Sequence, residues 1–136
     1  MKNLKLTVRI NKSAKEVFEF TLNPINTPLW IDSIVKETAD PIPAQIGTIY
    51  RNWNTSSEMN EYKVAQYEPF KVFQLDATHQ DYKVRYTLTP ISKTKTELEY
   101  YEWSESGQLH LPFMQETLDK LKSVMENSFK ERQSSS

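Results

Sequence analysis

The sequence predicts an α+β domain in which a curved antiparallel sheet of about six or seven strands wraps around one long helix at the C-terminal end of the chain. Three observations carry this prediction. In the middle of the chain, short segments with an apolar residue at every second position follow one another, which is typical of strands covered on one face. Near the end, apolar residues recur every three or four positions, as in an amphipathic helix. Between the first strand and the others, prolines limit two short helices.

The first strand and the first helix are indicated by the stretch INKSAKEVFEF and the residues before it. Apolar residues alternate with charged and polar ones from Leu4 to Ile10, which predicts a half-buried strand. Ser13 stands three positions before Glu16, the spacing of a capping box, in which the two side chains satisfy free backbone N–H groups at the start of a helix. Pro24 ends that helix, because proline disfavours helical geometry in the residue before it.

A second short helix is predicted around Pro28, since proline suits the first turn of a helix. This helix would carry Leu29, Trp30 and Ile34. The prolines and the glycine of the next segment, ADPIPAQIG, predict a loop over residues 39–47.

Extended segments follow in quick succession after this loop. The links between them, TSS, EPF, THQ and PISKTK, are short enough for the hairpins of an antiparallel meander. The clearest alternation runs from Tyr82 to Thr89, with one apolar and one polar face. The strands predicted here are Thr48–Thr55, Glu58–Tyr67, Lys71–Thr78, Asp81–Pro90 and Thr94–Ser104.

The last element is predicted to be a long helix. Pro112 suits its first turn, and its acidic residues lie early and its basic residues late, which complements the helix dipole. At 1.5 Å per residue such a helix is about 30 Å long, enough to cross the sheet. Its apolar stripe consists of Met114, Leu118, Leu121, Met125 and Phe129.

Length and composition fit a single small domain. The chain has 136 residues, and we expect one domain over residues 1–131 followed by a polar tail over residues 132–136. Its formal net charge of −1 argues against a nucleic-acid partner, which generally requires a basic surface. No apolar run approaches the roughly 20 residues of a membrane-spanning helix, so we expect no membrane insertion. The N-terminal residues lack the apolar segment of a signal peptide, and we expect a cytoplasmic protein that is a monomer or a weak homodimer.

Some kinds of chemistry are excluded by the residues themselves. The chain contains no cysteine, which rules out disulfides, thiolate ligands and thiol nucleophiles. With only two glycines it cannot build the glycine-rich loops that bind ATP or NAD, and we expect no cofactor. The two histidines, His79 and His110, stand far apart without a partner at metal-ligand spacing, so no metal site is predicted.

Four features occur together along residues 4–129: the strand and capped helix of INKSAKEVFEF, Trp30 in the second helix, QIGT before the next strand, and the closing amphipathic helix. In this combination the chain resembles the helix-grip proteins of the START and Bet v 1-like superfamily, most of all their bacterial polyketide cyclase/dehydrase branch. The resemblance implies that the two short helices form a V supporting one end of the long helix. It also implies a cavity between helix and sheet that binds apolar small molecules, sometimes with catalysis on them.

Within such a cavity, the alternation of the strands and the stripe of the helix predict which side chains face inward. The alternative is that the same residues fill a core. Arg51 shares the phase of Trp53, so it either binds a ligand carboxylate or hydroxyl from inside or packs its stem on the sheet with its head in water. The predicted ligand-binding residues are Trp53, Tyr62, Phe73, Tyr86, Tyr100, Phe113, Met114, Thr117, Leu118, Leu121 and Arg51.

Three residues are candidates for acid–base catalysis, namely Glu102, His110 and Tyr86. Glu102 continues the phase of Tyr100, which would turn a carboxyl group inward, where burial generally raises a carboxyl pKa. The alternative is a bulge or strand end that turns Glu102 to solvent and brings Trp103 inward. His110 precedes the last helix, at a junction that borders one mouth of the cavity in the helix-grip fold.

The resemblance leaves three functions open. The first, which we expect, is binding of a hydrophobic or aromatic small molecule, lipid-like or polyketide-like. The second is a cyclase/dehydratase-type enzyme that uses acid–base groups in the same cavity. The third is a protein-interaction module, because some relatives act on chaperones or ribosomes. An open cavity favours the first, a buried carboxyl group of raised pKa favours the second, and a filled cavity favours the third.

Overall fold

The fold places three helices against one sheet in the computed structural model, which describes residues 1–107 and 113–134. The described elements are β1 (Lys2–Ile10), α1 (Ala14–Leu22), α2 (Thr27–Trp30), β2 (Ile34–Asp40), β3 (Ile49–Asn54), β4 (Met59–Glu68), β5 (Val72–Ala77), β6 (Lys83–Ser92), β7 (Lys95–Ser104) and α3 (Gln115–Ser134).

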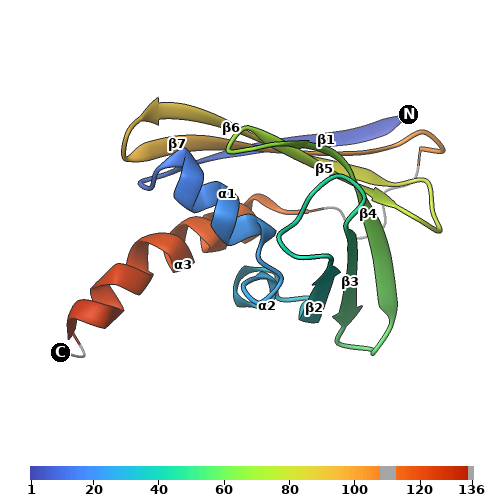
Figure 1. The fold of residues 1–136 in the computed structure, drawn as a ribbon, viewed down its shortest axis with the longest axis horizontal. Coiled ribbons are helices and arrows are strands. Elements are labelled where there is room, and N and C mark those ends of the chain that lie inside the picture. Colours follow the sequence, from blue (N-terminus) through green and yellow to red (C-terminus); the bar gives the residue numbers. More distant parts are fainter. Residues whose placement is uncertain (108–112, 135–136) are drawn as a thin grey trace.

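The strands of this described part form a single seven-stranded sheet in the order β1-β7-β6-β5-β4-β3-β2, and every neighbouring pair is antiparallel. Strands β2 to β7 follow one another as a meander, and β1 adds to the free side of β7. The sheet curves between β5 and β3, and the three helices lie on its concave side (Figure 1). The predicted α+β fold, with two short helices after the first strand and a long helix against a curved antiparallel sheet, is confirmed.

Helix α1 begins as the sequence predicts. The Ser13 hydroxyl accepts a hydrogen bond from the Glu16 N–H at 3.1 Å, and the Glu16 carboxylate accepts one from the Ser13 N–H at 3.3 Å. The capping box therefore fixes where the chain turns from β1 into the helix. The apolar side of α1 is buried against the sheet, with Val17 and Phe18 at its centre.

The prediction that Ile34 lies on the second helix is wrong. Helix α2 is a single turn that ends at Trp30, and Ile34 begins β2, an edge strand paired with β3. The alternation of β2 is broken by a register shift between Ile34 and Lys36, the mark of an irregular strand. Because of that shift Glu37, and not Lys36, lies on the same side of the strand as Ile34. A strand without period two gives no strand signal in the sequence, which explains the error.

The long helix α3 packs into the concave face of the sheet. Leu118 and Leu121 have no exposed surface, and Met125 is also buried, so the central part of the predicted stripe is confirmed. Met114 precedes the helix and is 57% exposed, so it is not part of the buried stripe. Pro112 and the side chain of Phe129 lie outside the described residues.

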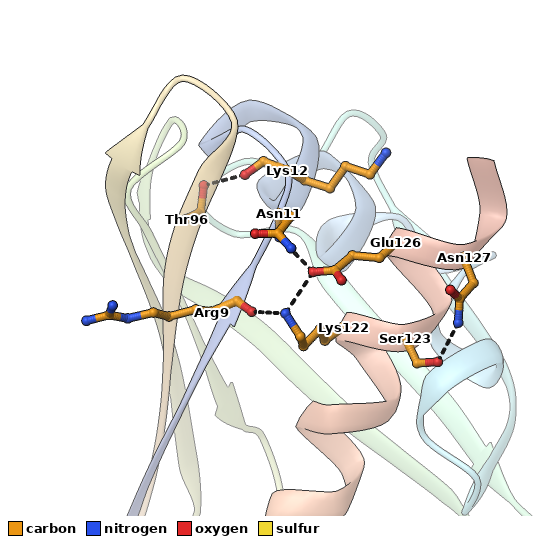
Figure 2. A network of polar contacts seen from close by, with 8 residues as sticks. All are labelled: Arg9, Asn11, Lys12, Thr96, Lys122, Ser123, Glu126 and Asn127. Atoms are coloured by element: carbon orange, nitrogen blue, oxygen red, sulfur yellow. Dashed lines mark hydrogen bonds and ion pairs between the residues drawn. The ribbon is translucent and has the colours of Figure 1, made fainter. Parts of the chain in front are cut away.

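The second half of α3 is fastened to the end of β1 by the polar network shown in Figure 2. The Lys122 ammonium donates to the Arg9 carbonyl at 2.7 Å and to the Glu126 carboxylate at 2.9 Å. The Asn11 N–H donates to the same Glu126 oxygen at 2.8 Å. Two backbone groups at the end of β1, the Arg9 carbonyl and the Asn11 N–H, thus find partners on the helix.

Glu126→Gln is expected to weaken this attachment more at neutral pH than in acid. Partial burial by itself raises the pKa of Glu126, but the Asn11 N–H and the Lys122 ammonium outweigh burial and lower that pKa below its usual 4.5. A carboxylate whose pKa is lowered by folding stabilises the folded state above the usual value, and this contribution is lost as the pH falls through the folded-state pKa. The variant should therefore lose about 1 kcal/mol at neutral pH and less near pH 3, where more of the Glu126 carboxylate is protonated.

Urea unfolding of both proteins at the two pH values measures this difference. Glu19→Gln is the matched control, because Glu19 lies on the exposed side of α1, where Lys15 is 4.0 Å away. A loss of the same size at both pH values would contradict the electrostatic role of Glu126.

Candidate functional site

A recess lies between the concave face of the sheet and α2. Its inner part has a volume of about 90 Å³, and an adjoining outer part has about 470 Å³. The inner part is walled mainly by aromatic rings, whereas the outer part is walled mainly by polar side chains such as Asn54, Asn60 and Gln80. The two parts are continuous, since they share the walls formed by Ile31, Ile34, Asn52, Tyr62, Tyr82 and Phe113.

The aromatic wall is built by direct cross-strand neighbours. Phe73 of β5 stands opposite Tyr86 of β6, which in turn stands opposite Tyr100 of β7. The rings of Phe73 and Tyr86 stack with centroids 4.4 Å apart, and those of Tyr100 and Phe113 stack at 4.1 Å. The Trp30 ring meets Tyr86 and Phe113 edge-on, at 6.5 and 5.9 Å. Such contacts fix the rings in place, so the recess keeps its shape without a ligand.

The sequence places part of this wall correctly. Tyr62, Phe73, Tyr86, Tyr100 and Phe113, all predicted to face a cavity, line the inner part of the recess. Phe73, Tyr86 and Tyr100 are found by period-two alternation alone, because the ladder from β5 to β7 has no register shift at these positions.

The prediction that Arg51 and Trp53 face inward is wrong. Tyr50 and Asn52 of β3 line the recess, so Arg51 and Trp53 lie on the opposite face of the sheet. There the Arg51 guanidinium donates to the Glu61 carboxylate at 2.8 Å, and Lys36 lies over the Trp53 ring at 5.3 Å. The stretch YRNWN has an aromatic residue in each phase, so its alternation does not decide which face is covered.

The predicted helix residues are not in the recess, with the exception of Phe113, which precedes α3. Leu118 and Leu121 are completely buried in the core, so at these two positions the alternative of core filling holds. Thr117 is half-buried and Met114 is exposed, and neither lines the recess. The recess lies beside the start of the helix, while the middle of the helix is closed against the sheet. His110 lies outside the described residues.

Glu102 points inward, and the alternative of a bulge is wrong. It pairs in unbroken register with Leu4 of β1 and Val84 of β6, and only 1% of it is exposed. Its carboxylate accepts a hydrogen bond from the Phe113 N–H at 2.9 Å, which places the Phe113 ring at the recess. Trp103 lies on the outer face, under the Arg85 guanidinium.

Glu37 is a site residue that sequence reasoning missed. Its carboxylate accepts hydrogen bonds from the Thr27 hydroxyl at 2.6 Å and from the Asn52 side chain at 3.2 Å, and it lines the inner recess. Burial raises the pKa of Glu37, and the two hydrogen bonds offset this only in part. Because β2 was not predicted, and because its register shift decides which residues face inward, no sequence signal identified Glu37.

The tyrosine hydroxyls of the recess are neutral at physiological pH. Burial raises the pKa of Tyr62 to about 12 and that of Tyr86 well above its usual value of 10.0. Tyr82 and Tyr100, whose pKa values burial also raises, share a hydrogen bond between their hydroxyls at 3.1 Å. Within the described residues, no protein group is hydrogen-bonded to the hydroxyls of Tyr62 and Tyr86, so both are available to a ligand.

Within the described ranges, no three histidine or carboxylate side chains gather in a way that suits a metal ion. Nor does any helix in those ranges combine the length and the apolar character needed to cross a bilayer.

The curved sheet, the long helix against it and the recess beside the start of that helix define a helix-grip protein, and solved structures share this fold. The protein MLL2253 from Mesorhizobium loti is 17% identical with a TM-score of 0.69, covering 93% of this chain and 98% of that chain. The di-domain ARO/CYC StfQ from the steffimycin biosynthetic pathway is 15% identical with a TM-score of 0.73, covering 95% of this chain and 46% of StfQ. The Aha1 dimer from Colwellia psychrerythraea is 12% identical with a TM-score of 0.60, covering 96% of this chain and 94% of that chain.

No family model and no curated protein matches the sequence. At these low identities the structural likeness establishes the fold. The helix-grip fold that the resemblance implies is thereby confirmed.

Proposed function

We propose that the protein binds an apolar or aromatic small molecule in the recess between the sheet and α2. The observation that carries this proposal is the aromatic wall, in which the hydroxyls of Tyr62 and Tyr86 have no hydrogen-bond partner within the described residues. Burying apolar ligand surface against these rings supplies affinity, and a few polar groups at fixed positions orient the ligand. The likeness to StfQ, a di-domain ARO/CYC, supports a role for this fold in handling aromatic compounds.

A second candidate function, acid–base catalysis of the cyclase or dehydratase type, is favoured by Glu37. Burial raises the pKa of Glu37, which makes its carboxyl group better suited to giving and taking a proton than an exposed carboxyl group is. Tyr86 serves in this case as a hydrogen-bond donor and not as a base, because burial raises its pKa. Turnover of an aromatic ketone that Glu37→Gln abolishes, without loss of binding, would favour the enzyme over the binding protein.

The binding proposal is tested by native mass spectrometry of the purified protein, followed by denaturing extraction of any bound compound. In parallel, a panel of naphthols, quinones and fatty acids is screened for stabilisation of the folded state, which any ligand of the native protein must produce. We expect at least one compound class to raise the melting temperature in proportion to its concentration. If no compound is retained and none in the panel stabilises the protein, the binding proposal is rejected.

Tyr86→Phe is expected to weaken binding of a hydroxylated or carbonyl-bearing aromatic compound by roughly fivefold to tenfold, the effect of one lost hydrogen bond. The melting temperature should stay unchanged, because the ring keeps its stack on Phe73 and the hydroxyl has no protein partner to lose. Calorimetric titration measures the first effect and a thermal melt the second.

Tyr101→Phe is the matched control, since Tyr101 lies on the outer face of β7, stacked on Trp103 at 4.9 Å. It should change neither affinity nor melting temperature by a comparable amount. Unchanged binding in Tyr86→Phe, or an equal loss in the control, would show that the Tyr86 hydroxyl does not contact the ligand.

A further inference from the structure

The ionisable residues around the recess, apart from its tyrosines, are all acidic among the described residues. Glu37 lies in its inner wall, Asp81 in its outer wall, and the buried Glu102 directly behind Phe113. Among the described residues that line either part, none is lysine, arginine or histidine. Glu37 and Glu102 also have no ion-pair partner in the described part of the chain; their hydrogen bonds come from neutral donors only.

The outer face of the sheet has the opposite arrangement. There each of three aromatic rings is covered by a cation of the chain itself: Lys5 over Tyr101, Lys36 over Trp53, and Arg85 over Trp103. The rings inside the recess have no such cover among the described residues. Aromatic faces next to a carboxylate attract a positive charge, and the described residues that line the recess do not provide one.

We propose that the ligand of the recess has a positively charged amine head and an apolar body. This inference rests on the proposed function and adds the chemical class of the ligand. The head lies in the inner part, beside Glu37 and against the rings of Trp30 and Tyr86. The apolar body lies where the two parts meet, against Ile31, Ile34 and Phe113. The hydroxyl oxygens of Tyr62 and Tyr86 accept hydrogen bonds from the amine when it carries N–H groups.

The energetics of Glu37 agree with a cationic ligand. A carboxylate removed from water without a counter-charge is destabilised, and burial accordingly raises the pKa of Glu37 in the free protein. The titratable groups that face it are the tyrosines Tyr50, Tyr62 and Tyr86, from β3, β4 and β6, and α2 contributes only the neutral Thr27. A cation bound here supplies the missing counter-charge, so binding favours the ionised form of Glu37 and lowers its pKa.

This coupling predicts a direction for the pH dependence. The cation competes with the proton on Glu37, so affinity rises with pH until the pH exceeds the raised pKa of the free protein. A neutral ligand of the same shape gains nothing from ionised Glu37, and its affinity stays constant or falls as the pH rises.

The test compares benzyltrimethylammonium with neopentylbenzene, in which a neutral quaternary carbon replaces the charged nitrogen. Binding of each is measured by NMR titration in mildly acidic and in mildly alkaline buffer. We expect the cation to bind at least tenfold more tightly than the neutral compound in alkaline buffer, with a smaller ratio in acid. Glu37→Gln should remove most of this ratio, because it weakens binding of the cation and leaves the affinity for the neutral compound unchanged.

Two controls are needed, one for the folding of Glu37→Gln and one for the overall charge of the protein. In Glu37→Gln the amide can donate to the Thr27 hydroxyl and accept from Asn52, so we expect the variant to fold, and a thermal melt verifies this. If Glu37→Gln does not fold, Glu37→Asp replaces it in the test, because the shorter side chain withdraws the carboxylate from the ligand. Glu97→Gln is the control for overall charge, since Glu97 lies on β7 in an exposed ion pair with Arg9. Selectivity for the cation should survive in this control.

Each outcome separates the inference from the function on which it rests. Equal binding of the two compounds, or cation binding that is unaffected by Glu37→Gln, would overturn the inference and leave the proposed function standing. An equal loss in Glu37→Gln and Glu97→Gln would overturn it as well, because attraction to the whole surface would then explain the selectivity. Binding of neither compound would overturn the inference, and the proposed function would fall as well only if no compound were retained by the purified protein and none in the panel stabilised it.

Discussion

Leu118→Asp is expected to unfold the domain. Leu118 lies in α3 with no exposed surface, packed between the helix and the sheet, so the substitution places a charge where no partner or water reaches it. The loss of packing alone typically costs about 2 to 5 kcal/mol, and the unpaired charge adds to this. Since small domains are stable by only about 5 to 15 kcal/mol, most or all of the stability should be lost.

Circular dichroism and a thermal melt measure this effect. Met114→Asp is the matched control, because Met114 belongs to the same apolar pattern in the sequence but is 57% exposed just before the helix. It should fold and melt close to the wild type. A normally folded Leu118→Asp protein would contradict the packing of α3 against the sheet.

Trp30→Ala is expected to have the second-largest effect, a loss of about 3 to 5 kcal/mol. The Trp30 side chain is 1% exposed and joins the rings of Tyr86 and Phe113, so its removal disconnects α2 from the wall of the recess. Trp30→Phe should cost much less. It keeps an aromatic ring in place and removes an indole N–H that is buried without a hydrogen-bond partner in the described structure.

Chemical denaturation of the two variants tests this. Trp53→Ala is the control for loss of an indole ring, since Trp53 is half-buried on the outer face beneath Lys36. Its expected cost is about 1 kcal/mol. If Trp30→Ala is no more destabilising than Trp53→Ala, Trp30 does not fix α2 to the sheet in the way that its contacts indicate.

The parts of the fold that the sequence predicts are those with a regular local pattern. The capping box of Ser13 and Glu16 fixes the start of α1, and regular alternation places Phe73, Tyr86 and Tyr100 on one face of the sheet. The apolar spacing of α3 identifies its buried side. In each case neighbouring residues along the chain carry the information, so no knowledge of distant contacts is required.

The parts that the sequence does not predict depend on contacts between distant segments. Strand β2 exists because it pairs with β3, and its register shift turns Glu37 toward the recess. The face of β3 that is covered is decided by the helices above it, so Asn52 lines the recess where Arg51 was expected. The recess lies beside Phe113 and not along the middle of α3. This position, too, depends on how distant segments pack together.

The central claim is that small molecules bind in the recess and not on the outer face of the sheet. Methyl NMR tests it most directly, with isoleucine, leucine and valine methyl groups labelled and an aromatic compound that stabilises the protein titrated in. Methyl groups that line the recess belong to Ile31, Ile34, Leu75 and Val84, whereas those of Val35 and Ile91 are exposed outside it.

If the compound binds in the recess, the NMR signals of the recess methyl groups should shift until binding saturates, and those of Val35 and Ile91 should stay unchanged. Shifts confined to Val35, Ile91 or other exposed methyl groups would contradict it and would favour a surface-interaction module instead.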